Sequence, residues 1–126
     1  KSYLEGLRRE ADKRGMLLIF DEAQTAFGRI GARSAAEYFG VTPDIMTVSK
    51  TLGGGLPLAG TITTDEIEAV AHERGFTYYT SHVSDPLPAA VGLAVLATLE
   101  EERLIERARE KGAYLRSRLD DLQQKY

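Results

Sequence analysis

Apolar residues along this chain recur either at helical spacing or in short unbroken runs. Residues 2–14 place apolar side chains on one helical face and predict an amphipathic helix that ends at Gly15, a C-terminal cap. The apolar runs that predict strands are Met16–Phe20, Ile45–Val48 and Leu58–Thr63, with Phe76–Tyr79 as a candidate for a short fourth strand. The first run has no polar alternation, which is typical of a strand covered on both faces.

Helices are predicted between and after these strands. Ser34 could cap a short helix that runs to about Phe39, and Thr64 or Asp65 could cap a second. Asp85-Pro86 predicts the start of a third helix. Asp is a good N-cap, and proline is tolerated at the first helical position because the backbone N–H at that position would have no partner within the helix. Since strands alternate with helices, the predicted class is α/β with a mainly parallel sheet.

The last helical stretch is predicted to change character along its length. Residues 89–99 are small or apolar on every side, which indicates burial. From Glu100 onward the pattern is charged with a stripe of Leu and Ile, which indicates an exposed surface, and a break is expected near residues 102–103 or at Gly112. The sequence begins at Lys1 without Met and both starts and ends in a helical pattern, so we expect a fragment of a longer protein.

Composition narrows the class of protein without identifying a function. A chain of 126 residues that is 43% hydrophobic and 28% charged is typical of one globular domain. The net charge of −3 gives no reason to expect nucleic acid or a membrane as partner. The absence of Cys excludes disulfides and thiolate chemistry, and no apolar run approaches the roughly 20 residues of a membrane span. A cytoplasmic location is expected.

Lys50 has the most unusual surroundings of any charged residue in the chain. It is the only charged residue between Ile45 and Thr64. Burial lowers the pKa of a lysine, and the neutral amine is the form that makes a Schiff base with a carbonyl group. A lysine at the end of a strand that reaches solvent is an equally good interpretation of its position alone.

Polar residues at the end of the first predicted strand are a second candidate. Asp21-Glu22 follows this strand directly, at the edge where open α/β sheets bind ligands. A carboxylate there can pair with a protonated pyridine nitrogen, although taken alone it could also be a helix cap or a surface acid. Gln24 could hydrogen-bond a ligand or simply the loop backbone.

Other polar and glycine-rich positions carry weaker signals. Gly53–Gly55 lets the backbone approach a ligand or a neighbouring chain, but it matches neither a P-loop nor a dinucleotide fingerprint. Ser81 precedes the helix that begins at Asp85 and could bind an anion, although a loop serine is commonly a turn former. His72 is predicted on a helix surface and receives no role, and no set of His and carboxylates has zinc-ligand spacing.

Three segments together resemble the class III aminotransferases, a family of fold-type I enzymes that use pyridoxal 5'-phosphate (PLP). They are LLIFDEAQTAFGRIG (17–31), VTPDIMTVSKTLGGGLPLAG (41–60) and YYTSHVSDPLPAAVGLAVL (78–96). The resemblance is collinear over nearly the whole chain. It implies that residues 1–100 are a portion of the PLP-binding large domain and that residues 101–126 form an interdomain helix leading toward a C-terminal domain.

The resemblance implies roles for four residues. Lys50 matches the lysine that forms the Schiff base and moves protons, and Asp21 matches the acid that pairs with the pyridinium nitrogen. Gln24 matches the side chain that hydrogen-bonds the phenolic oxygen of PLP. Ser81 occupies the position of the threonine that binds the cofactor phosphate of the neighbouring subunit. Amino acid and keto acid substrates and a homodimer, or a dimer of dimers, are implied with them.

The third segment departs from the usual family pattern, in which a Thr is followed by an aromatic residue and Gly-Asn-Pro. Residues 81–86 read Ser-His-Val-Ser-Asp-Pro, which resembles the 2,2-dialkylglycine decarboxylases of the family, enzymes that couple decarboxylation to transamination. An alkali-metal ion, potassium or sodium, lies near this loop in those enzymes. The matching positions here are Ser81, Val83 through its backbone carbonyl, and Asp85, and oxygen ligands suit such a hard cation.

Three functional hypotheses follow for this chain. The first is part of a PLP-dependent enzyme that decarboxylates and transaminates 2,2-dialkylglycines, with a keto acid as amino acceptor. The second is part of an ordinary ω- or acylornithine-type aminotransferase with the same cofactor residues. The third is a non-catalytic remnant that acts only as a folding or dimerisation unit, since the isolated fragment is expected to be inactive and aggregation-prone. The presence of Asp21, Gln24 and Lys50 together favours a catalytic parent protein.

Overall fold

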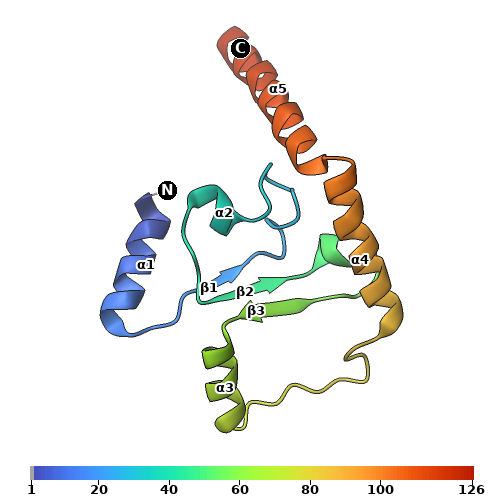
Figure 1. Cartoon of the computed structure of the whole chain (residues 1–126). Helices are drawn as coiled ribbons and strands as arrows, with labels where there is room; N and C mark the ends of the chain where they lie inside the picture. The colour runs from blue at the N-terminus through green and yellow to red at the C-terminus, as the bar shows by residue number, and fades with distance from the viewer. Residues whose placement is uncertain (1) are drawn as a thin grey trace.

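A three-stranded mixed sheet lies at the centre of the computed structural model, which describes residues 2–126 (Figure 1). Its strands, in spatial order, are β1 (Ile19–Asp21), β2 (Ile45–Val48) and β3 (Gly60–Thr63). β1 and β2 run parallel, whereas β3 runs antiparallel to β2. The α/β class is confirmed, but the sheet is mixed because residues 49–59, which join β2 to β3, are too few for the crossover that parallel neighbours need.

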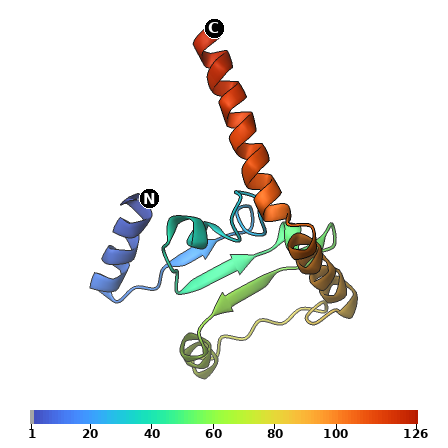
Figure 2. The same cartoon turned by 45° about the horizontal axis from the view of Figure 1, so that its top comes forward.

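Within residues 2–126, six helical segments flank or follow this sheet. They are α1 (Ser2–Arg14), α2 (Ala35–Phe39), the 3-10 helix η1 (Lys50–Gly53), α3 (Asp65–Glu73), α4 (Pro86–Glu101) and α5 (Leu104–Lys125). α4 packs beside η1, and α5 extends away from the sheet in both views (Figures 1 and 2). Within residues 2–126, no helix is both long enough and apolar enough to cross a membrane.

The helix ends follow the chemistry of their terminal residues. Gly15 adopts a left-handed conformation with φ of 62°, and its N–H bonds to the carbonyl of Asp12, which ends α1 as predicted. The Ser34 hydroxyl accepts a hydrogen bond from the Glu37 N–H at 3.0 Å, so it caps α2. The Thr64 hydroxyl caps α3 in the same way, through the Ile67 N–H at 3.4 Å.

The predicted break in the last helical stretch is confirmed at residues 102–103. α4 ends at Glu101, and Arg103 takes a left-handed conformation with φ of 51° before α5 begins. The alternative position at Gly112 is wrong, since α5 continues through it without interruption. The two helices therefore leave the sheet in different directions, as Figure 2 shows.

One charged cluster joins α1 to the start of the sheet. The Asp44 carboxylate accepts hydrogen bonds from the Leu18 N–H at 2.6 Å and from the Arg8 guanidinium at 2.7 Å. These two bonds, that from Leu18 first, lower the pKa of Asp44 below its ordinary value. The Thr63 hydroxyl donates to the Asp44 carbonyl at 2.9 Å, so this residue also ties β2 to β3.

The core is small, and three predictions of burial or strand structure are wrong. Within residues 2–126 the buried apolar side chains are Ala11, Ala26, Ala32, Val41 and Val48. The run Met16–Phe20 contributes only Ile19 and Phe20 to a strand, and Met16 is 59% exposed. Residues Phe76–Tyr79 form no strand, with Tyr79 92% exposed. Residues 89–99 bury only Gly92, since α4 packs against η1 and meets α5, while most of its side chains stay exposed within residues 2–126.

Candidate active site

Asp21 and Lys50 lie at the same edge of the sheet. Asp21 is the last residue of β1 and is paired in register with Thr47 of β2. β2 ends one residue later at Val48, and Lys50 is the first residue of η1. Because β1 and β2 are parallel, both strands deliver their C-terminal residues to one edge, the place where open α/β sheets bind ligands.

The Asp21 carboxylate is held in place by one of its two oxygens. Its Oδ1 accepts hydrogen bonds from the Ala23 N–H at 3.0 Å and from the Thr47 hydroxyl at 3.3 Å. Within residues 2–126, Oδ2 accepts no hydrogen bond, and the residue is exposed. The side chain is thus oriented by its own chain while one oxygen remains available to a donor from outside.

Lys50 is exposed, which agrees with the interpretation of a lysine at a strand end that reaches solvent and not with that of a buried amine. The connection from β2 to β3 carries it past the strand end, and the described residues leave its side chain in contact with solvent. Its backbone has a feature that the sequence did not predict: φ is 52°, in the left-handed region that residues other than glycine rarely adopt. Such conformations concentrate at functional sites.

A hollow of about 640 Å³ brings Lys50 together with the loop that precedes α4. Its lining includes Lys50 and Tyr78 together with Val83 and Asp85. Ser81 belongs to the same turn and is exposed, but it does not line the hollow. The structure therefore places two of the three predicted metal-ligand positions, Val83 and Asp85, around the same hollow as Lys50. The third, Ser81, belongs to the adjoining turn but does not line the hollow.

The Asp85 carboxylate has a local partner in this loop. Its Oδ2 lies 2.7 Å from Nδ1 of His82, and the side chain makes no capping bond to α4, although Asp85 stands at the N-cap position. Pro86 occupies the first turn of the helix as predicted. No group of three or more His, Cys, Asp or Glu side chains in residues 2–126 is arranged to hold a metal ion.

Glu22, the neighbour of Asp21, is the polar residue that sequence reasoning missed. Its side chain is fully buried, whereas Asp21 is exposed. The Glu22 carboxylate accepts hydrogen bonds from the Thr25 hydroxyl and from the N–H groups of Ala35 and Ala36, the latter two at 2.9 and 2.8 Å. The sequence did not indicate that Glu22 would turn inward, because the two backbone N–H groups that bind its carboxylate lie 13 and 14 residues further along the chain.

Gln24 lies in a tight turn that begins at Glu22. The Glu22 carbonyl accepts hydrogen bonds from the Thr25 N–H at 3.2 Å and the Ala26 N–H at 3.0 Å. The Gln24 side chain is exposed on this turn, three residues beyond Asp21. It is therefore placed to contact a ligand at the same edge of the sheet.

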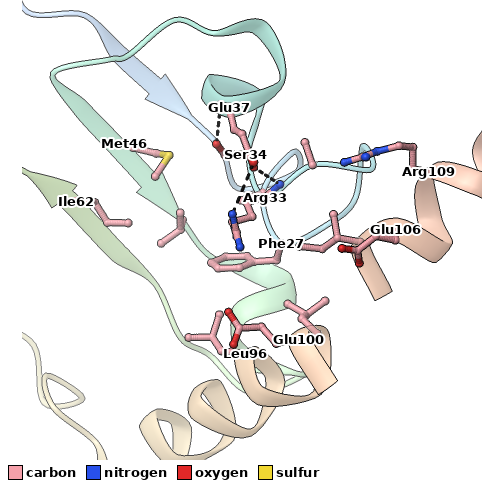
Figure 3. Close-up of a pocket in the computed structure, with 15 residues that line it drawn as sticks. Phe27, Arg33, Ser34, Glu37, Met46, Ile62, Leu96, Glu100, Glu106 and Arg109 are labelled. Carbon is pink, nitrogen blue, oxygen red and sulfur yellow. Dashed lines mark hydrogen bonds and ion pairs between the residues drawn. The ribbon is translucent and has the colours of Figure 1, made fainter. Parts of the chain in front are cut away.

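A second hollow, also of about 640 Å³, lies on the face of the sheet opposite to the Thr47 side chain (Figure 3). Met46 and Ile62 line it, and strand alternation places their side chains on the face opposite to Thr47. Figure 3 shows Glu37, Glu106 and Arg109 around an apolar floor. Its lining contains none of the candidate residues Asp21, Gln24, Lys50 and Ser81, so it is separate from the candidate site.

Comparison with known proteins identifies the class to which this arrangement belongs. Residues 1–126 match the family described as aminotransferase class-III. An uncharacterized aminotransferase of Schizosaccharomyces pombe is 48% identical, covering 100% of this chain and 28% of that protein. The acetylornithine aminotransferase of Pseudomonas putida is 39% identical over 100% of this chain and 30% of its own length. The 5-aminovalerate aminotransferase of Pseudomonas aeruginosa is 41% identical over 100% of this chain and 29% of its own.

Solved structures agree with this assignment. An S-selective transaminase from Arthrobacter sp., crystallised with alanine bound, has a TM-score of 0.91 at 34% identity, covering 98% of this chain and 27% of that chain. The chain belongs to the class III aminotransferase family, whose members are PLP-dependent enzymes of fold type I. It spans less than a third of the length of these relatives.

The residues at the sheet edge fit the cofactor of this family. PLP carries a pyridine nitrogen that is protonated when a carboxylate faces it, and Asp21 offers the free Oδ2 that such a donor needs. PLP also carries an aldehyde that a lysine amine attacks, and Lys50 is exposed at the same edge. Asp21 and Lys50 are therefore chemically complementary to two groups of PLP, the ring nitrogen and the aldehyde.

Proposed function

We propose that this chain supplies the cofactor-binding edge of a PLP-dependent ω- or acylornithine-type aminotransferase. The observation that carries the proposal is the placement of Asp21 and Lys50 at the ends of two parallel neighbouring strands. The relatives named for acetylornithine and for 5-aminovalerate support an ω-amino or acylated diamino acid as donor. A keto acid would accept the amino group.

Each candidate residue has a distinct task in this proposal. PLP, when bound, supplies an electron sink that stabilises negative charge at the substrate carbon. The Lys50 amine would hold the aldehyde carbon covalently and, once displaced by substrate, would move a proton from the amino-bearing carbon of the substrate to the former aldehyde carbon. Asp21 Oδ2 would accept a hydrogen bond from the ring N–H and keep that nitrogen protonated. Gln24 would donate to the phenolic oxygen, and the Ser81 hydroxyl would donate to the phosphate of a neighbouring subunit.

The proposal extends to the whole protein. Residues 1–100 would form part of the cofactor domain, and residues 101–126 would lead toward a further domain; the change of direction at Arg103 supports this division. A cytoplasmic homodimer is the proposed assembly. The uncovered apolar sides of α4 support contacts beyond the described residues.

Residues 81–86 favour a second candidate, a 2,2-dialkylglycine decarboxylase. A dialkyl substrate has no proton on its central carbon, so the bond that breaks must be the one to CO2. In this candidate Ser81, the Val83 carbonyl and Asp85 would hold a potassium or sodium ion, and Asp85 would have to leave or share its contact with His82. Release of CO2 from 2-aminoisobutyrate, together with its dependence on potassium, separates this candidate from an ordinary aminotransferase.

Borohydride reduction of the full-length protein with PLP tests the shared part of both candidates. Peptide mass mapping is expected to find a phosphopyridoxyl group on Lys50, and none after the substitution Lys50→Ala. Lys111, an exposed lysine on α5, serves as the matched position, since Lys111→Ala should leave the adduct in place. A folded protein without an adduct on Lys50 at excess PLP would instead support the non-catalytic remnant.

A further inference from the structure

Glu22 is a buried acid for which the proposed chemistry has no use. We propose that Glu22 is a positioning residue: it fixes residues 21–26, here called the cofactor loop, so that Asp21 and Gln24 face the ring of PLP. This inference rests on the proposed function, because it requires Asp21 and Gln24 to bind the cofactor. Glu22 itself touches neither substrate nor cofactor in this account.

The Glu22 side chain joins the cofactor loop to α2. Oε1 accepts a hydrogen bond from the Ala36 N–H, and Oε2 accepts bonds from the Ala35 N–H and the Thr25 hydroxyl. Ala35 and Ala36 are the first two residues of α2, whose N–H groups have no partners within the helix. One carboxylate therefore satisfies two helix N–H groups and one loop hydroxyl at the same time.

The Glu22 backbone joins the same loop to the sheet. Its N–H donates to the Thr47 carbonyl at 2.9 Å, which continues the pairing of β1 with β2 by one residue. Its carbonyl accepts the N–H groups of Thr25 and Ala26 and so closes the turn that presents Gln24. Because Asp21 is its direct neighbour and Gln24 lies inside the turn, a displacement of Glu22 moves both cofactor contacts together.

Burial makes this arrangement sensitive to a change of a single atom. The three donors to Glu22 are uncharged, so its fully buried carboxylate depends on these hydrogen bonds. Glutamine has nearly the same size but replaces one acceptor oxygen with an NH2 group, which would face N–H or O–H donors. At least one buried donor then loses its partner, and the loop has to shift to restore it.

The test compares variants of the full-length enzyme by cofactor binding and by stability. For Glu22→Gln we expect the PLP dissociation constant to rise about tenfold or more, with a shifted absorbance band of the bound cofactor. The matched control is Glu37→Gln: Glu37 also accepts a backbone N–H, from Arg33 at 2.7 Å, but it is exposed and lines the hollow on the opposite face. Its dissociation constant should stay within about twofold of wild type.

A milder variant keeps the inference testable where Glu22→Gln fails to fold. Thr25→Val removes one donor to Glu22 and leaves both helix N–H groups paired. We therefore expect the PLP dissociation constant to rise by a smaller factor, about threefold. Circular dichroism and thermal unfolding of the apoenzymes measure the structural effect separately. Variants that melt earlier yet bind PLP with the wild-type constant and spectrum would overturn the positioning role while the Lys50 adduct upholds the proposed function. A wild-type protein that takes up no PLP would overturn both.

Discussion

Backbone strain distinguishes Lys50 from the other candidate residues. Its φ of 52° lies in the left-handed region, where a side chain with a Cβ costs roughly 1–2 kcal/mol relative to the right-handed form. The two glycines that follow η1, Gly54 and Gly55, also have positive φ, of 56° and 105°, but bear no such cost. The chain thus keeps a lysine where glycine would be easier to accommodate, which is understandable where the amine itself is needed.

This strain predicts opposite effects of glycine at two lysines. Lys50→Gly should raise the free energy of unfolding of the full-length apoenzyme by about 0.5–1 kcal/mol relative to Lys50→Ala, since relief of strain exceeds the added entropy of the unfolded chain. At Lys111, which lies inside α5, the free energy of unfolding of the glycine variant should be about 1 kcal/mol lower than that of the alanine variant. Urea unfolding of the four variants measures both differences. Equal signs at the two positions would contradict the assignment of strain to Lys50.

A second prediction concerns Thr47, the residue opposite Asp21. Its hydroxyl donates to Asp21 Oδ1 at 3.3 Å, so Thr47→Val should loosen the carboxylate and weaken PLP binding about three- to tenfold. Thr61 is paired with Thr47 across β2 and β3 and is exposed on the same face, which makes Thr61→Val the control. PLP titration followed by absorbance provides the measurement. Equal losses in both variants would assign the effect to the sheet rather than to Asp21.

At the scale of elements, the loop between β1 and α2 is held against α5 by a close backbone approach. The Arg109 guanidinium donates to the Gly31 carbonyl at 2.9 Å. A Cβ built on Gly31 would lie 2.9 Å from Arg109 Cβ and 3.0 Å from its Cα, and Gly31 has φ of 75°. Glycine is required there for two independent reasons, the left-handed conformation and the lack of space.

The variant Gly31→Ala separates these two reasons when compared with Gly40→Ala. Gly40 has φ of 67° and open space around its Cα, so its substitution should cost only the conformational strain, about 1–2 kcal/mol. Gly31→Ala should cost about 1–3 kcal/mol more, because α5 has to move. Thermal unfolding of the full-length variants gives the two values. A similar loss at both glycines would show that α5 does not pack against this loop in the whole protein.

The Asp44 cluster predicts a pH dependence of the contact between α1 and the sheet. Hydrogen bonds from the Leu18 N–H and from Arg8 lower the pKa of Asp44 in the folded state below its ordinary value, which is about 3.9 in unfolded chains. The ionised carboxylate therefore contributes stability that is complete above about pH 4 and is lost as the pH falls through the lower, folded-state pKa. Asp44→Asn should lower stability at neutral pH, and its difference from wild type should shrink below about pH 4.

Urea unfolding at a series of pH values between about 7 and 2 measures this difference. Asp120, a half-buried acid paired with Arg116 on α5, provides the control, since Asp120→Asn removes only a solvent-accessible ion pair and should change stability little at any pH. A difference between wild type and Asp44→Asn that persists unchanged at the acid end would contradict the role given to the Asp44 charge.

For the whole molecule, local features were predictable from the sequence and burial was not. The caps at Gly15, Ser34 and Thr64 are encoded within three or four residues of each helix end, and the run Ile45–Val48 coincides with β2. The direction of β3 and the inward turn of Glu22 depend on contacts between distant segments, which no local pattern specifies. The C-terminal positions of Asp21 and Lys50 followed from the strand pattern, whereas the backbone strain at Lys50 did not.

Exposed apolar surface on α4 leads to opposite expectations for the isolated chain and for the full-length protein. Leu87 is 66% exposed and Leu93 is 70% exposed, on a helix that is apolar on nearly every side. Surfaces of this kind associate with other copies or with missing segments. The 126-residue chain alone is therefore expected to self-associate and to lack activity, and Leu87→Lys with Leu93→Lys should reduce its association.

In the full-length enzyme the same pair of substitutions should be harmful. If α4 is covered there, the lost burial destabilises the fold by about 1.5–3 kcal/mol for each leucine. The control is Glu101→Gln with Glu102→Gln, because two added lysines and two removed glutamates both make the net charge more positive by about two. Light scattering of the short chain and thermal unfolding of the full-length protein measure the two effects. A short chain that stays monomeric, or a full-length variant that melts like the control, would show that the apolar sides of α4 face solvent in the working protein.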